Sequence, residues 1–255
     1  MTLWQMAAVL LAGVAAGTIN TVVGSGTLIT FPTLLAMGVP PVTANVSNTV
    51  GLVPGSVSGA IGYRRELDGQ RGRLLRLGTA SLLGGLLGGV LLLKLPPDVF
   101  GAVVPALIAL GCLLVVFQPM ISRQVSARTA RRGGIPDHGA AWVWVLVFAT
   151  GVYGGYFGAA QGVLLMAVLG IGLEETMQRN NATKNVLAAL VNGVAAVLFL
   201  FVAHVDWRAA VLIAIGSTIG GQIGARVGRR LPPLALRVVI VVVGVFALVK
   251  FLVAP

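Results

Sequence analysis

Apolar residues follow one another along most of this chain, and the first charged residue is Arg64. Several apolar runs reach the roughly 20 residues that a helix needs to cross the hydrocarbon layer of a membrane. The strict alternation that is typical of a membrane-spanning strand is absent, so we expect helices to carry the spans. The pattern therefore predicts an all-α, polytopic transmembrane helical protein.

Two short apolar runs interrupt the series of full-length spans. Each has about 11 residues and would cover about 17 Å as a helix, which is half of the membrane. We predict that each short run is the return limb of a re-entrant hairpin, with a glycine-rich tip inside the membrane. The full spans are expected over residues 3–23, 43–63, 74–93, 99–121, 140–158, 183–203, 207–227 and 234–253, and the short runs over 27–37 and 162–172.

The second half of the chain repeats the first half at an offset of 136 residues. Gly26 corresponds to Gly162 and Asn45 to Asn181, and a Ser-x-x-Gly-Gly-x-x-Gly motif returns at the same offset. Each copy has one hairpin and three crossings. Because three is an odd number, the two copies have opposite orientations in the membrane and are inverted repeats. Such a duplicated membrane unit is typical of transporters whose substrate site lies between the copies. The expected units are a first repeat (1–121), a basic cytoplasmic linker (122–139) and a second repeat (140–255).

Composition and charge support a membrane protein with a defined orientation. Only 10% of residues are charged against 57% hydrophobic, too few for the polar surface of a soluble domain. The net charge of +11 comes from basic residues in short loops, so we do not expect nucleic acid as a partner. If the repeats are inverted, 15 basic residues, Lys184 among them, lie in the inside loops and 3 lie outside. If each hairpin counted as a single crossing, the split would be 11 and 7. We therefore expect a multi-pass protein of a bacterial cell membrane with both termini outside.

Two polar breaks, at residues 24–27 (Gly-Ser-Gly-Thr) and 159–162 (Ala-Ala-Gln-Gly), lie at matching places in the two copies. Unpaired N–H groups at a helix start, together with the helix dipole, favour an anion. These tips are therefore predicted to form a midplane substrate site. The alternative is that the glycines only permit a tight turn and close packing.

A second polar group follows each hairpin, at residues 45–49 and 181–185. Asn, Ser and Thr in these segments could cap the next span or line the substrate path. The ammonium group of Lys184 needs a partner such as an anion if it is buried, and the alternative is a snorkelling side chain. The predicted substrate-binding residues are Asn20, Ser25, Gly26, Thr27, Asn48, Thr49, Gln161, Gly162, Lys184, Asn185 and Asn192.

Other classes of protein are disfavoured by what the spans lack. All seven acidic residues lie in loops or at span ends, so no carboxylate is placed to hold a cation or relay protons. Cys112 is the single cysteine, and no His, Asp or Glu cluster has ligand spacing. We expect no catalytic residues, no metal and no cofactor, which disfavours a membrane enzyme. A non-transporting scaffold is disfavoured because no soluble domain is attached. Proton coupling and a homodimer are left open.

At these motifs the chain resembles the TauE/SafE family of sulfite-exporter-like permeases. The resemblance covers nearly the whole chain, and its order and duplication make it fairly specific. It is carried by the break at 24–27 with the run to Phe31-Pro32, the start of the next span (44–49), the basic loop after Tyr63, and the second copy at 181–183.

The resemblance implies a transporter of sulfite, of sulfonates such as sulfoacetate, or of other small organic anions. Ser25, Thr27 and Gln161 depart from the nearly unbroken glycine runs of the family, which bears on the substrate. We expect alternating access around the midplane site; a channel-like pore, or a carrier of another small organic anion, is the alternative.

Overall fold

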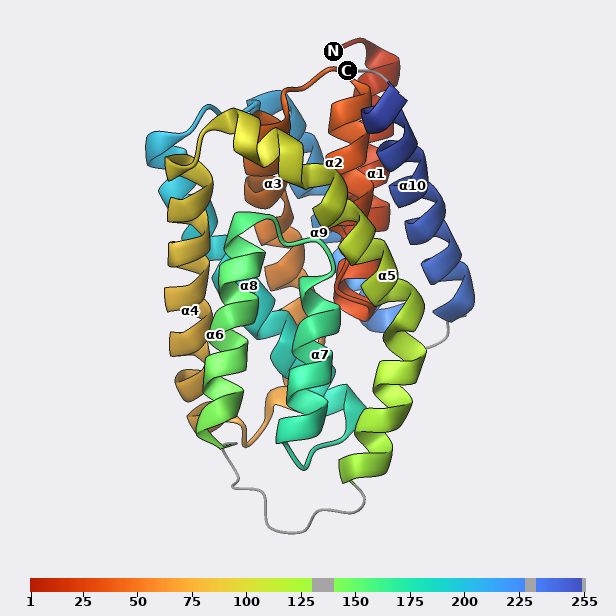
Figure 1. Cartoon of the computed structure of the whole chain (residues 1–255). Coiled ribbons are helices and arrows are strands. Elements are labelled where there is room, and N and C mark those ends of the chain that lie inside the picture. Colours follow the sequence, from red (N-terminus) through yellow and green to blue (C-terminus); the bar gives the residue numbers. More distant parts are fainter. Residues whose placement is uncertain (130–139, 228–232, 254–255) are drawn as a thin grey trace.

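The computed structural model describes residues 1–129, 140–227 and 233–253, and within these ranges all regular structure is helical (Figure 1). The helices are α1 (Leu3–Val22), α2 (Thr27–Ala36), α3 (Pro41–Gly62), the short 3₁₀ helix η1 (Arg64–Leu67), α4 (Arg71–Lys94), α5 (Pro97–Thr129), α6 (Ala141–Tyr156), α7 (Gln161–Gly172), α8 (Met177–Val202), α9 (Trp207–Val227) and α10 (Pro233–Val253). Five of these helices are long and apolar enough to cross a membrane, and a polytopic all-α membrane protein is confirmed.

Both predicted hairpins are present, and they enter from opposite faces of the molecule. In Figure 1, α1 begins and α2 ends at the face where α10 also ends, whereas α6 begins and α7 ends at the opposite face, where α5 ends (the linker face). The two breaks come together near the middle of the bundle. Each hairpin is followed by three long helices, α3–α5 and α8–α10, and the hairpins enter from opposite ends, so the two repeats are inverted as predicted.

The repeats exchange packing partners, because the hairpin of one lies against the fourth helix of the other. Helix α1 packs on α9, and α4 packs on α6. A Cβ on Gly17 would lie 2.2 Å from the carbonyl oxygen of Ser217, and one on Gly88 would lie 2.1 Å from that of Val152. The Gly-rich faces therefore hold the two repeats together inside one chain, since any side chain there would separate the helices.

Several boundaries differ from the predicted ones. Helix α8 begins at Met177, six residues before the expected start, because the hydroxyl of Thr176 caps it by accepting a 3.3 Å hydrogen bond from the N–H of Arg179. Helix α5 continues to Thr129 through the first part of the predicted linker. The rest of the predicted linker (130–139) and residues 228–232, with their arginines, lie outside the described residues.

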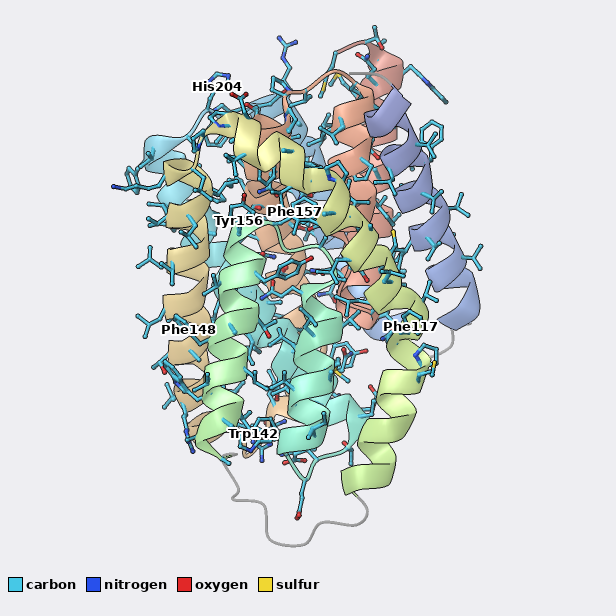
Figure 2. The ribbon with its side chains drawn as sticks, in the orientation of Figure 1. Phe117, Trp142, Phe148, Tyr156, Phe157 and His204 are labelled. Carbon is cyan, nitrogen blue, oxygen red and sulfur yellow. The ribbon has the colours of Figure 1, made fainter. Side chains whose placement is uncertain are left out.

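The outer surface is apolar along the helices and aromatic near their ends. Leu75, Leu83 and Leu86 of α4 point outward, as a lipid-facing stripe requires. Trp142 lies at the linker end of α6 (Figure 2), whereas Trp4 and Trp207 lie in the first turns of α1 and α9, which start at the opposite face. Tryptophan at both ends is typical of the two membrane–water interfaces.

Candidate functional site

The two hairpin tips touch each other through their backbones. The N–H of Gly162 donates a 3.0 Å hydrogen bond to the carbonyl oxygen of Gly24. A Cβ on Gly24 would lie 2.3 Å from the Cα of Gly162, so neither position accommodates a side chain. Gly24 also has a φ of +90°, in the region that favours glycine, and Ala160 has a φ of 58°. The contact brings the two predicted breaks to one place.

A polar side chain without a partner follows Gly24 in one tip and precedes Gly162 in the other. Ser25 is fully buried, and its Oγ has no hydrogen-bond partner among the described residues. Gln161 is 4% exposed, and its Nε2 likewise lacks a partner. The two residues are equivalent under the 136-residue offset. Unpaired buried polar atoms cost free energy, so two at equivalent positions indicate a place where a polar ligand can bind.

The backbone amides at the two helix starts differ. The N–H groups of Ser25, Gly26 and Thr27 have no acceptor in the part of the chain that the structure describes, whereas those of Gln161 and Gly162 are bonded to Gly158 and Gly24. The first tip therefore offers free amides at the positive end of a helix, as predicted for an anion site. The second tip offers its side chain instead.

Lys184 is fully buried in α8, and its Nζ donates 3.1 Å hydrogen bonds to the carbonyl oxygens of Asn20 and Thr21. The amides of Asn181 and Asn185 reach the same Thr21 oxygen at 3.3 Å. The negative end of the α1 dipole thus meets a cation and two amide donors. Lys184 is neither a snorkelling side chain nor a loop residue, so counting it among the inside loop charges was wrong.

The first repeat makes an equivalent contact to the second. Asn45 in α3 donates a 2.9 Å hydrogen bond to the carbonyl oxygen of Tyr156, the last residue of α6. Asn181 is its equivalent in α8. Each asparagine caps the end of the hairpin helix of the other repeat, so the interpretation that they cap their own helices is wrong.

Asn48 and Thr49, the two predicted substrate-binding residues of α3, bond within the first repeat. The amide of Asn48 donates to the hydroxyl of Thr27 at 3.3 Å, and its Oδ1 accepts from Thr30. Thr49 donates to the carbonyl oxygen of Asn45, one turn back in its own helix, at 2.9 Å. Asn48 therefore fixes the start of α2, whereas Thr49 is bonded to its own helix.

Asn20 and Asn192 meet at a serine that the sequence interpretation missed. Both amides donate to the hydroxyl of Ser56 at 3.3 Å. Ser56 is the equivalent of Asn192 under the offset, so the offset itself could have identified it. A Cβ on Gly26 would lie 3.0 Å from the Cβ of Asn20, which places this polar cluster beside the first tip. It joins α1, α3 and α8 next to the crossing.

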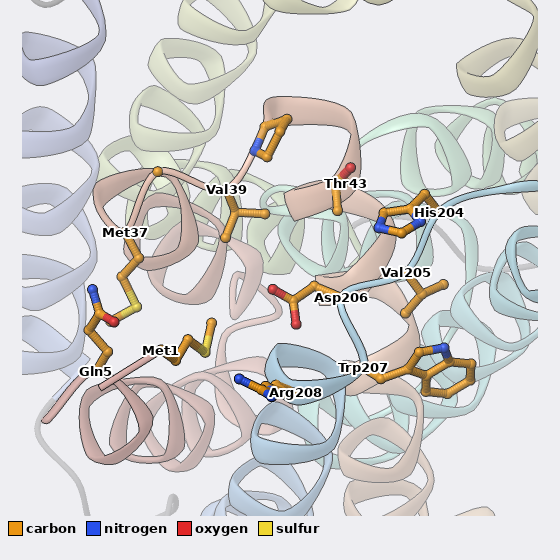
Figure 3. A pocket seen from close by; sticks show the side chains of 12 residues that line it. Met1, Gln5, Met37, Val39, Thr43, His204, Val205, Asp206, Trp207 and Arg208 are labelled. Atoms are coloured by element: carbon orange, nitrogen blue, oxygen red, sulfur yellow. The ribbon is translucent and has the colours of Figure 1, made fainter. Parts of the chain in front are cut away.

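A cavity of about 570 Å³ opens at the face that carries the termini (Figure 3). Figure 3 shows His204, Asp206 and Arg208 on one side of it and Met1 and Met37 on the other. The backbone N–H of Asp206 donates to the hydroxyl of Ser47 at 2.8 Å, which ties this rim to α3. Among the described residues no group of His, Cys, Asp and Glu could hold a metal ion.

Comparison with known proteins indicates a membrane transporter. A sequence model of the family described as "Sulfite exporter TauE/SafE" matches residues 9–251. "Probable membrane transporter protein ORF9" of Sinorhizobium sp is 27% identical over 223 residues, covering 83% of this chain and 78% of that protein. "Probable membrane transporter protein YfcA" of Escherichia coli K12 is 25% identical over 210 residues, covering 79% and 72%. No solved structure matches the chain significantly.

Proposed function

The chain belongs to the sulfite exporter TauE/SafE family, and from that premise we propose that it carries a small sulfur-containing anion, such as sulfite or an organosulfonate. The coarser prediction is confirmed, because the family and the named relatives are membrane transporters and not enzymes. The substrate would bind where the two hairpin tips cross. The transport mechanism would be alternating access between the inverted repeats.

The observation that carries this proposal is the pair of unpartnered polar groups beside the Gly24–Gly162 contact. Ser25 Oγ and Gln161 Nε2 can both donate to oxyanion oxygens. The free amides of residues 25–27 add donors at the positive end of α2. Hydrogen-bond donors that have no acceptor in the protein suit a ligand whose polar atoms are all acceptors. The oxygens of sulfite and of a sulfonate group are such acceptors.

The way in which the hairpins are anchored supports alternating access. Each hairpin is bonded to the third helix of the other repeat through Asn45 or Asn181, and the tips share one hydrogen bond. Movement of one repeat against the other would shift its partner's hairpin and change which face reaches the crossing. Lys184 would act as a positioning residue whose charge also makes the crossing electropositive.

Flux in proteoliposomes tests the substrate. Sulfite, sulfoacetate, sulfate, taurine and a monocarboxylate would each be offered with and without a proton gradient. We expect saturable flux of a sulfur oxyanion that Ser25→Ala and Gln161→Leu each lower about tenfold, the value of one charge-assisted hydrogen bond. Ser81→Ala is the matched control, because Ser81 is also a buried serine with an unpartnered hydroxyl, but it lies in α4.

The flux measurements also separate a carrier from a channel-like pore, and a sulfur anion from another organic anion. Trans-stimulation in a counterflow assay indicates a carrier, and its absence indicates a pore. Saturable flux of the monocarboxylate alone would refute the sulfur anion while leaving the crossing as the site. Unchanged flux in both tip variants would refute the site.

We also propose that both termini lie outside the cell membrane. The linker face carries the arginines of η1 and the start of α4, together with Arg179 and Arg226, which fits the excess of positive charge on cytoplasmic loops. Cysteines introduced one at a time into Cys112→Ser protein, at Thr2 and at Asp68, test this proposal. An impermeant maleimide should label position 2 in intact cells and position 68 only after lysis; the reverse pattern would invert the topology.

A further inference from the structure

A basic pocket lies at the linker face, away from the crossing, where α3 ends and α9 leaves the membrane. It has a volume of about 390 Å³, and its lining includes Arg64, Arg65 and Glu66 of η1 and Arg226 of α9. None of the three arginines forms an ion pair with a carboxylate in the described part of the chain. The pocket thus holds three guanidinium groups against one carboxylate.

An apolar groove of about 550 Å³ runs from this pocket along the outside of α9. Thr218, Ile219, Gln222, Ile223 and Arg226 line it. Their spacing places them on one face of the helix, so the groove follows α9 from the charged end toward the middle of the membrane. Pocket and groove share Gln222 and Arg226, so the two are adjacent.

Hydrogen bonds between α3 and α9 fix the floor of this surface. Gln222 Nε2 donates to the carbonyl oxygen of Ser58 at 2.8 Å and to its hydroxyl at 3.0 Å. The Ser58 hydroxyl in turn donates to the carbonyl oxygen of Thr218 at 2.8 Å. A Cβ on Gly62 would lie 2.3 Å from the Cβ of Ala225, so the two helix ends approach closely. The surface is therefore preformed.

We propose that pocket and groove together bind one anionic phospholipid, with its phosphate among Arg64, Arg65 and Arg226 and an acyl chain along Ile219 and Ile223. Guanidinium groups match the geometry of phosphate oxygens and can bind them in pairs. Basic pockets between helices at a membrane surface suit anionic headgroups. Ile219 and Ile223 are 50% and 39% exposed, so the groove is open to lipid. This site is independent of the proposed substrate.

Native mass spectrometry of the purified chain in mixed micelles tests the proposal. Phosphatidylglycerol and phosphatidylcholine with the same acyl chains are supplied in equal amounts. We expect phosphatidylglycerol to be retained about tenfold better, and the double variant Arg65→Gln/Arg226→Gln to lose this preference. Arg65→Lys/Arg226→Lys should keep most of it. Arg71→Gln is the matched control, because Arg71 is exposed at the same face outside the pocket.

A separate variant tests the apolar groove. Ile223→Trp should fill it and weaken phosphatidylglycerol retention, whereas Val211→Trp, at another exposed position of α9, should not. Gel filtration and thermal melting confirm that each variant is folded. Equal retention of both lipids would overturn the proposal, as would displacement of phosphatidylglycerol by millimolar inorganic phosphate, which indicates a free-anion site. A lipid-free dimer that buries Ile219 and Ile223 would overturn it as well.

Discussion

The carbonyl oxygen of Gly24 accepts a 3.0 Å hydrogen bond from the N–H of Gly162, so one backbone contact joins the two inverted repeats at the point where both hairpins turn. This contact places Ser25 and Gln161 next to the same crossing. Two positions with no sequence proximity thereby become one site, and its geometry depends on the absence of side chains at Gly24 and Gly162.

Alanine at either glycine of the crossing should damage both stability and transport. A Cβ on Gly162 would lie 2.4 Å from the Cα of Gly24, which forces the tips apart, and Gly24 also has a positive φ. We expect each variant to lose about 2 kcal/mol or more in the free energy of unfolding. Thermal melting in detergent and proteoliposome flux measure the effect. Gly193→Ala in α8, where the Cβ meets nothing within 4 Å, is the control and should melt no lower than the natural protein.

The exchanged caps predict two losses of stability of unequal size. Asn45→Leu and Asn181→Leu each remove an amide that bonds the last turn of the other repeat's hairpin helix. Asn45→Leu should lower the free energy of unfolding by about 1–3 kcal/mol, since the carbonyl oxygen of Tyr156 loses the Asn45 amide. Asn181→Leu should lower it by less, since the Thr21 oxygen keeps Lys184 and Asn185 as donors. Thermal melting measures both. Gln178→Leu, at an exposed amide in the first turn of α8, is the control. A larger loss at Asn181 than at Asn45 would contradict this assignment of the contacts.

Sequence alone could predict the hairpins, the inversion and the tips, because run length and a fixed offset are properties of the chain. It could not predict the partners of Asn45, Asn181 and Lys184, since these contacts reach helix ends in the other repeat. The partners of the Ser47 and Thr183 hydroxyls could not be predicted from the sequence either. Ser47 accepts from the backbone of Asp206, and Thr183 donates to the side chain of Gln70 at 3.0 Å.

The predicted start of α8 at residue 183 is wrong for a local reason. A hydropathy pattern marks the apolar part of a helix, whereas the polar first turns of α8, from Met177, read as a loop. Lys184 and Asn185 therefore lie two turns inside the helix, where only tertiary packing decides what they contact. Whether any of the eleven predicted residues touches the substrate stays a prediction.

Lys184 should prove to be a positioning residue. Lys184→Met leaves the Asn20 carbonyl without its donor and removes the cation at the end of α1. We expect a loss of about 2 kcal/mol in the free energy of unfolding, together with at least tenfold lower flux. Lys184→Gln keeps a donor and should recover part of the melting temperature. A Lys184→Met protein with unchanged melting but no flux would instead make Lys184 a direct substrate contact.

The Glu175 carboxylate predicts how stability depends on pH at the linker face. It binds Arg73 Nη1 at 2.9 Å and Arg179 Nε at 2.7 Å, and so joins the loop before α8 to the start of α4. Burial raises the pKa of Glu175, but the hydrogen bonds and charges of Arg73 and Arg179 outweigh burial and hold the pKa below its ordinary value of 4.5. The two ion pairs therefore stabilise the fold at pH values above 4.5.

Because the pKa of Glu175 is lower in the folded state, the unfolded state takes up its proton first as pH falls. This stabilisation should be complete at pH 7, begin to fall near the ordinary pKa of 4.5, and vanish once the pH drops below the folded pKa. Glu175→Gln should lose about 1 kcal/mol at neutral pH, with a difference from the natural protein that shrinks on acidification. Thermal melting between pH 7 and about pH 3 follows this difference. Asp68→Asn is the control, because Asp68 is exposed at the same face and its carboxylate forms no ion pair with the described residues. A difference that grows as the pH falls would contradict the assignment.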